Sequence, residues 1–223
     1  MNSEFQQLQD DYWNKDQSKR RSPFHPCVRA LFEPRAKYLA SISNDEKDSI
    51  LEIGSGNGYM SVYLEENFNN VLVSDLSEEM LKHNPCKKKL KASATDLPLE
   101  DNSFDLVTCS HLLHHLSDED KVKAINEMKR VARKKVVVYE PYRNNPLNFL
   151  FGLVVQEERE SLKFSKSYLK TLFTNSGLTI ESIRVEGCTL PNKAPLFWVP
   201  IGNYLDKTFV RNLGFYICAT ALV

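Results

Sequence analysis

The chain has 223 residues, 42% of them hydrophobic, which is enough for one domain with a substantial buried core. Its 29 Lys and Arg residues balance its 29 Asp and Glu residues, so no global field draws it onto nucleic acid or anionic lipid. The longest apolar runs, residues 149–155 and 196–201, fall well short of the roughly 20 residues that cross a bilayer. We therefore expect a soluble protein with no membrane span.

The five cysteines are scattered and include no CxxC pair, so they predict neither a disulfide framework nor a zinc site. The first 17 residues are polar and acidic, whereas a signal peptide needs a basic start and an apolar middle. Both features predict a cytoplasmic protein.

From residue 48 onward, short apolar runs alternate with amphipathic segments, the pattern of βαβ units around a parallel sheet. The predicted strands are 49–53, 71–74, 90–92, 104–109 and 135–139, with a closing pair at 179–185 and 215–222. Helices are predicted at about 59–67, after a cap at Ser77, from Ser117 into the basic residues of 130–135, and from a cap at Ser165 to about 175.

We interpret residues 1–223 as a single domain whose core is 48–141. Three segments lie outside the regular pattern: an N-terminal helical cover at 1–42 and two insertions at 142–164 and 188–213. They are the expected substrate-side cover.

The strongest motif is ILEIGSGNG at residues 50–58, an apolar strand that runs into a glycine-rich turn and a helix. Glycines allow a sharp turn and a close approach of ligand to backbone, and the start of a helix offers unpaired N–H groups. A tight turn that binds nothing is the alternative.

A second acidic position strengthens a ligand-binding interpretation. Asp75 ends the next strand 75 − 54 = 21 residues after Gly54, near the spacing of about 20 expected for a carboxylate that holds a ribose. Asp75 could instead cap the helix near Ser77. A dinucleotide oxidoreductase would need glycine where this chain has Tyr59, which disfavours NAD.

Three motifs in order, ILEIGSGNG, VSDLSEEML and ATDLPLEDNSFDLVTCSHLLHHL, resemble the class I S-adenosylmethionine-dependent methyltransferases, especially the small-molecule group with the ubiquinone and menaquinone C-methyltransferases. The resemblance covers residues 50–141. It implies an α/β, Rossmann-like seven-stranded sheet, mostly parallel with an antiparallel last strand, helices on both faces and a helical cover over the C-terminal strand edge.

The resemblance also implies roles for single residues. Gly54, Ser55 and Gly56 would pack against the methionine part of S-adenosylmethionine, supported by Glu52 and completed by the main chain at Cys109 and Ser110. At the other end, Asp75 would hold the ribose, Leu76 would lie against the adenine, Asp96 would accept from the adenine amino group, and the Leu97 N–H would donate to the ring. Plain turn, cap or structural roles are the alternatives for Asp96, Ser110 and Glu52.

His111, His114 and His115 form a tight ionisable cluster. On a helix they would share a face and could bind a metal, but the sequence places no carboxylate or cysteine with them, so we expect no metal. A general-base role for one histidine and simple packing under the donor are the alternatives.

Methyl transfer from a sulfonium is an in-line displacement, so a base is needed only for some acceptors. The candidates are His111 and Tyr142, which the resemblance places at the outer ends of sheet strands.

Aromatic residues in the cover, among them Tyr12, Trp13, residues 149–151 and residues 196–199, suggest a lid for a small apolar or aromatic acceptor, although they could equally be packing or dimer contacts. An RNA or protein acceptor and a non-catalytic S-adenosylmethionine-binding protein are the alternatives. We expect a monomer or homodimer.

Overall fold

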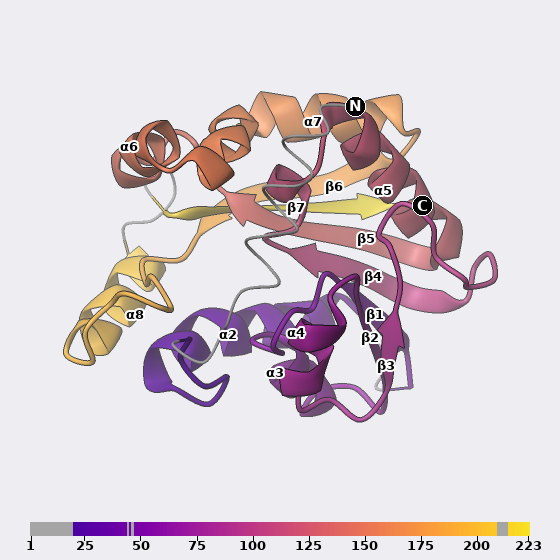
Figure 1. Ribbon diagram of the computed structural model, residues 1–223, viewed down its shortest axis with the longest axis horizontal. Helices are drawn as coiled ribbons and strands as arrows, with labels where there is room; N and C mark the ends of the chain where they lie inside the picture. The colour runs from indigo at the N-terminus through magenta and orange to yellow at the C-terminus, as the bar shows by residue number, and fades with distance from the viewer. Residues whose placement is uncertain (1–19, 44, 46, 209–213) are drawn as a thin grey trace.

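The computed structural model describes residues 20–43, 45, 47–208 and 214–223. Their core is a seven-stranded sheet of order β3-β2-β1-β4-β5-β7-β6 (Figure 1). The strands are β1 (Ser49–Ile53), β2 (Asn70–Asp75), β3 (Lys89–Lys91), β4 (Phe104–Ser110), β5 (Ala132–Pro141), β6 (Thr179–Glu186) and β7 (Tyr216–Leu222). β7 alone runs antiparallel to both of its neighbours, and the other pairings are parallel. The predicted fold class is confirmed.

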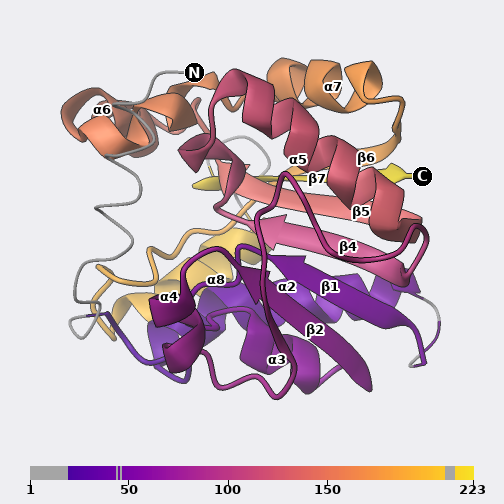
Figure 2. The same cartoon turned by 45° about the vertical axis from the view of Figure 1, so that its right-hand side comes forward.

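Helices cover both faces of this sheet, because successive side chains on a strand point to opposite faces. The helices α5 (Asp118–Val131) and α7 (Lys166–Asn175) pack on the face that carries Leu51, and α2 (Pro26–Ser43) and α3 (Ser61–Glu65) pack on the face that carries Ile50. Figure 2 shows the two helix layers above and below the strands. Ile50 and Leu51 are both fully buried, and each such side chain stabilises the fold by about 1.5–3 kcal/mol.

Three of the predicted helix starts are confirmed by side-chain caps. Ser77 accepts a hydrogen bond from the Met80 N–H at the start of α4 (Glu78–His83), and Ser117 accepts from Asp120 at the start of α5. Ser165 caps α7 in the same way by accepting from Tyr168. Each cap satisfies one of the N–H groups that a helix start leaves unpaired.

Two predicted helices are longer than the observed ones. α3 covers only residues 61–65, and α5 ends at Val131, so the basic residues 133–135 begin β5. Lys135 pairs with Leu222 of β7 and Ala132 pairs with Phe104 of β4. Sheet pairing on both sides therefore determines the conformation of this basic stretch, where the charge pattern alone favoured a helix end.

The predicted cover segments have different positions in the fold. α2 is largely core, with Val28, Leu31 and Leu39 buried against the sheet. Residues 142–164 form α6 (Pro146–Val154) and the 3-10 helix η2 (Gln156–Lys163), and α8 (Trp198–Thr208) packs against α2. None of the described helices is long and apolar enough to cross a membrane.

Candidate functional site

A cavity of about 860 Å³ opens at the carboxyl ends of β1, β2, β4 and β5. Gly54 follows β1, Asp75 ends β2, Ser110 ends β4 and Pro141 ends β5, and all four line the cavity. The strand order reverses between β1 and β4, which is where ligands bind in open parallel sheets. The topology thus brings residues far apart in the sequence to one edge.

The turn after β1 depends on glycine. Gly54 and Gly56 both have left-handed backbone angles, with φ of 68° and 52°. A Cβ on Gly54 would lie 2.8 Å from Leu112 Cδ1, and one on Gly56 would lie 3.0 Å from Met80 Cε. Any other residue at Gly54 would therefore strain the backbone and displace Leu112 from the cavity wall.

Asp75, at the end of β2, stabilises this turn by hydrogen bonds. Its Oδ2 accepts from the Gly56 N–H at 2.8 Å and its Oδ1 accepts from the Ser77 N–H at 2.9 Å. Burial raises the pKa of Asp75, while the backbone donors oppose that shift. Each carboxylate oxygen retains a lone pair that can accept a further hydrogen bond.

Glu52 lies on the cavity wall beside the same turn, with only 2% of its surface exposed. Ser61 Oγ of α3 donates to its Oε2 at 2.6 Å. Burial, with a smaller contribution from the charge of Asp75, raises the pKa of Glu52 to about 8 even though the Ser61 bond opposes the shift. A cation bound nearby would stabilise its ionised form.

Asp96 and Leu97 do not lie where the sequence resemblance puts them. Neither is among the cavity-lining residues: Asp96 is exposed, and the Leu97 N–H donates to Glu127 Oε2 at 2.8 Å. A bridge between Ser93 and Asp96 turns the chain just after β3, so Ser93 and Ala94 reach the cavity instead. In the described structure Ser93 and Ala94 therefore face the cavity, and Asp96 and Leu97 do not.

His111 follows β4 with φ of 58°, and its N–H donates to the Tyr139 carbonyl of β5 at 2.8 Å. Its Nε2 lies 3.2 Å from Arg35 Nη1. Because a guanidinium only donates, Nε2 must accept, and the proton of the neutral ring is on Nδ1. Burial, together with the charge of Arg35, holds the pKa of His111 well below its usual value.

Arg35 is a buried residue that sequence analysis missed. Its guanidinium, on α2, donates to Glu186 Oε1 at 2.7 Å and to Ser110 Oγ at 3.0 Å. It also lies over the rings of Phe32, Tyr139 and Tyr216 at 4.6–5.2 Å from their centroids. Glu186 lies 151 positions further along the chain, so no local pattern could have paired it with Arg35.

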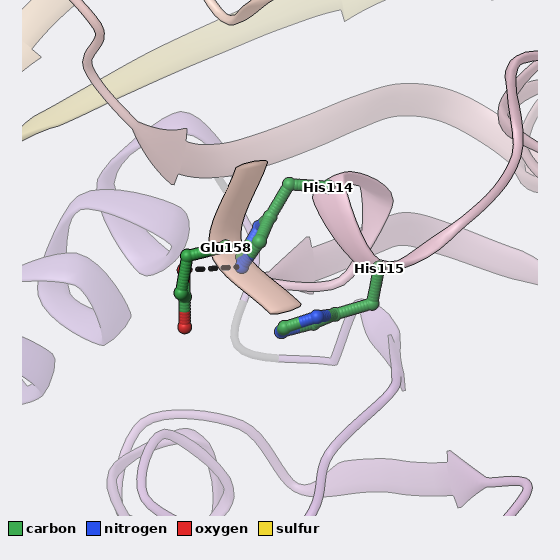
Figure 3. Close-up of side chains that lie close together, drawn as sticks. All are labelled: His114, His115 and Glu158. Carbon is green, nitrogen blue, oxygen red and sulfur yellow. Dashed lines mark ion pairs between the residues drawn. The ribbon is translucent and has the colours of Figure 1, made fainter. Parts of the chain in front are cut away.

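Of the other two histidines of the cluster, His114 lies between two glutamates, and Figure 3 shows it with His115 and with one of these glutamates, Glu158. His114 Nδ1 lies 2.5 Å from Glu140 Oε2 of β5, and its Nε2 lies 3.4 Å from Glu158 Oε2 of η2. Burial would lower the pKa of His114, but the charges and hydrogen bonds of the two glutamates outweigh it and raise the pKa to about 10. Burial holds the pKa of His115 well below its usual value. The charge of His114 adds to this shift, and the charge of Glu158 opposes it only in part.

Tyr142, the second candidate base, is not among the cavity-lining residues. It is 4% exposed and packs in the core under α5 and α7, and its hydroxyl accepts from Asn144 Nδ2 at 3.1 Å. Pro141 reaches the cavity and Tyr142 does not, since neighbouring residues at a strand end point in opposite directions. In the described structure Tyr142 thus lies in the core beside the cavity-lining Pro141.

Only part of the predicted aromatic lid borders the cavity. Leu147 and Phe151 of α6 line it, whereas Phe149 and Leu150 are exposed to solvent. From the second insertion, residues 190–193 line it; residues 196–199 do not, and Trp198 Nε1 donates to the Cys188 carbonyl. Tyr12 and Trp13 lie outside the described residues.

Sequence comparisons match the strands that build this cavity. A family model described as a methyltransferase domain matches residues 51–139. An uncharacterized protein of Methanocaldococcus jannaschii is 28% identical over 194 residues, which is 84% of each chain.

Characterised relatives match over less of their length. A phosphoethanolamine N-methyltransferase of Triticum aestivum is 31% identical over 105 residues, 43% of this chain and 21% of that protein. A ubiquinone/menaquinone biosynthesis C-methyltransferase of Francisella tularensis is 28% identical over 148 residues, 52% of this chain and 57% of that protein. The chain thus spans well under two thirds of the length of both.

A solved structure shares the whole fold. The crystal structure of an S-adenosylmethionine-dependent methyltransferase from Archaeoglobus fulgidus aligns with a TM-score of 0.65 at 18% identity, over 87% of this chain and 94% of that one.

Proposed function

Because this chain belongs to the class I S-adenosylmethionine-dependent methyltransferases, we propose that it transfers the methyl group of S-adenosylmethionine to a small acceptor with an apolar or aromatic body. The observation that carries this proposal is the single cavity that collects Gly54, Asp75 and Ser110 from three strand ends. The family supplies the donor, and the cavity walls suggest the acceptor.

The described residues fit the donor. The turn at Gly54 and Gly56 has no room for a Cβ, and so offers bare backbone for close contact with the amino-acid part. Both oxygens of Asp75 are fixed by backbone donors and can each accept from a ribose hydroxyl. Leu76 lines the cavity while 56% of its surface is exposed, as expected of a side chain that an adenine would cover.

We place the adenine edge against Ser93 and Ala94 in place of Asp96 and Leu97. Ser93 and Ala94 line the cavity next to Leu76, whereas the Leu97 N–H is already bonded to Glu127. A serine hydroxyl and a backbone N–H can replace the carboxylate and N–H that the sequence suggested. The proposed adenine contact is thus a neutral one.

The carboxylate of Glu52 would attract the positive ammonium group of the donor. It lines the cavity beside Gly54 and is buried enough for a nearby cation to interact strongly with its carboxylate. The methionine end would therefore lie between Glu52 and Ser110.

The acceptor would enter from the opposite wall, which is made by the cover segments. Phe32, Leu147, Phe151 and Leu190 give this wall an apolar character. Such a wall suits a ligand with an apolar or aromatic body. Because it lies mostly outside residues 51–139, the relatives' acceptors do not transfer to this chain by the family match alone.

The chemistry then depends mainly on alignment. S-adenosylmethionine supplies an electrophilic methyl group, and the cavity must hold the acceptor atom in line with it. His111 is neutral and its Nε2 already accepts from Arg35, so we assign His111 a positioning role and not that of a base. An acceptor that carries its own nucleophilic lone pair fits these walls without a protein base.

The described structure is also compatible with a reducing compartment. All five cysteines are unpaired, and four of them are buried. We infer a cytoplasmic enzyme, because free thiols persist where disulfides do not form.

Transfer of a radiolabelled methyl group to a panel of small molecules tests the proposal. The panel would contain phenols, quinols, apolar amines and phosphoethanolamine, and Asp75→Ala would be the inactive control. We expect label in at least one small acceptor and none with the variant. Label only in added RNA or protein would contradict a small acceptor, and tight donor binding without any transfer would favour a non-catalytic binding protein.

A further inference from the structure

His114, His115 and Glu158 form a compact group in the wall of the cavity (Figure 3). Each offers one ligand atom, and the three atoms lie within 4.8 Å of one another. The His114 Nε2 and Glu158 Oε2 atoms are 3.4 Å apart. Glu158 is the carboxylate that the sequence could not place beside the histidines, because η2 brings it there from 43 positions along the chain, 158 − 115 = 43.

We propose that His114, His115 and Glu158 bind one divalent transition-metal ion, with zinc as the first candidate. Two imidazole nitrogens and one carboxylate oxygen are a ligand set that zinc and other first-row divalent ions use in open sites. Ligand atoms that share a tetrahedral zinc at ~2.1 Å lie about 3.4 Å from one another, which is the separation already present between His114 and Glu158. Because the three ligand atoms lie within 4.8 Å of one another, the His115 nitrogen has to move toward the other two by up to about 1.4 Å.

Glu140 provides the support that metal-binding histidines use. Its Oε2 accepts a hydrogen bond from the Nδ1–H of His114, and its Oε1 accepts from the Leu112 and Leu113 N–H groups at 3.1 and 2.7 Å. A carboxylate on one ring nitrogen fixes the ring and directs the other nitrogen to the metal. Since Glu140 is fully buried and held at both oxygens, His114 Nε2 is preset toward Glu158.

The local charge also suits a divalent cation. Glu140 and Glu158 contribute two negative charges, and with both histidines neutral a divalent ion balances them. The alternative occupant of the same space is a proton on His114, shared between the two glutamates as a buried ion pair. Metal and proton would then compete for one nitrogen, and the experiment below distinguishes them.

Three protein ligands leave coordination positions open to the cavity. If the proposed methyl transfer takes place there, the ion would hold a hydroxyl or thiol of the acceptor and lower its pKa, so that its proton is lost to solvent and the more nucleophilic anion attacks the methyl group. This role rests on the proposed function, whereas the binding of the metal itself does not.

The test begins with wild-type protein stripped by a chelator and then titrated with Zn²⁺ by calorimetry. We expect one ion per chain, and at least tenfold weaker binding by Glu158→Gln and by His115→Gln. His83→Gln is the matched control, because His83 Nε2 and Glu79 Oε1 form an exposed pair 3.3 Å apart that could bind zinc on the surface. The control should bind as tightly as the wild type.

Cobalt spectroscopy of the unmutated protein covers the case in which a variant fails to fold. Co²⁺ in the site should give the intense visible bands of a four- or five-coordinate ion, and Zn²⁺ should bleach them. Weak bands of the hexahydrated ion, or binding that only His83→Gln removes, would overturn the metal site. S-adenosylhomocysteine is titrated into the same stripped protein, so that a missing metal site is distinguished from a missing donor site.

Discussion

Asp75 and Asp96 both come at or shortly after the end of a predicted strand, but they have different surroundings in the fold. Asp75 accepts two backbone hydrogen bonds at the cavity edge, whereas Asp96 is exposed after the Ser93 turn. The sequence predicted both as ligands because the spacing of motifs does not show which residue of a turn faces inward. The direction of the turn at Ser93 determines that Asp96 points away from the cavity.

Glu52 should make the stability of the ligand-free protein dependent on pH. Its pKa is about 8 in the fold and near 4.5 in the unfolded chain, so the stability it contributes is complete below pH 4.5 and is lost as pH rises to about 8. We expect Glu52→Gln to gain stability relative to wild type between pH 5 and pH 8.5, measured by urea unfolding at both values.

Glu33 is the control for this experiment, since its pKa is lowered to about 2 by hydrogen bonds from Arg29 and Lys37. A lowered pKa makes stability fall only as pH drops from about 4.5 toward 2. Glu33→Gln should therefore differ from wild type by nearly the same amount at pH 5 and 8.5. Parallel behaviour of the two variants would contradict the burial of an ionisable Glu52.

Removal of the buried charge of Arg35 should lower the stability of the fold strongly. Its loss would leave Glu186 with only its ion pair to Arg184 and would open a gap among three aromatic rings. We expect Arg35→Met to lower the free energy of unfolding by about 3 kcal/mol, measured by denaturant titration. Arg29→Met removes an exposed pair with Glu33 and should cost much less than Arg35→Met; equal costs would contradict the role of the buried Arg35.

At the scale of elements, the strands were well predicted and the turns were not. β1 was predicted with its observed bounds, because five buried residues in a row leave little choice. The left-handed backbone of His111, by contrast, depends on a hydrogen bond from its N–H to Tyr139 on the neighbouring strand. No local signal in the sequence marks such a residue, so the sequence analysis could not show this conformation of His111.

An alanine substitution in the turn between β1 and α3 should weaken ligand binding, whereas the same substitution in a turn outside the cavity should not. Gly54 and Gly177 both have φ of 68°, so Ala should strain each backbone by about 1 kcal/mol. At Gly54 the new Cβ would also meet Leu112, whereas at Gly177 it meets only the end of Lys129. We expect at least tenfold weaker S-adenosylhomocysteine binding in Gly54→Ala and unchanged binding in Gly177→Ala.

Calorimetry with both alanine variants decides this, with thermal unfolding as a check that each is folded. If Gly177→Ala lost the ligand as strongly as Gly54→Ala, the effect would be one of general stability. Unchanged binding in Gly54→Ala would contradict the close approach of the ligand at that turn.

At the scale of the whole molecule, the sheet is what makes a site from dispersed residues. The motifs predicted which strand ends would meet, since parallel strands bring their carboxyl ends to one edge. They could not predict Arg35, Glu140 or Glu158, whose partners lie on other elements. Those partners are set by how α2 and η2 pack, which has no short-range pattern in the sequence.

Ligand binding should stabilise the molecule as a whole. At 100 times the Kd, a ligand that binds only the folded state adds about 2.7 kcal/mol, which for a chain of this size is a rise in Tm of roughly 5–10 °C. We expect S-adenosylhomocysteine to produce such a rise in differential scanning calorimetry and NAD to produce none. A comparable rise with NAD would favour a dinucleotide enzyme.

The central claim is that the donor binds at the carboxyl edge against Asp75 and away from Asp96. Isothermal calorimetry with S-adenosylhomocysteine on wild type, Asp75→Ala and Asp96→Ala tests it most directly. We predict micromolar binding by the wild type, a loss of at least tenfold in Asp75→Ala and full retention in Asp96→Ala. Retention in Asp75→Ala, or loss in Asp96→Ala, would contradict the site described.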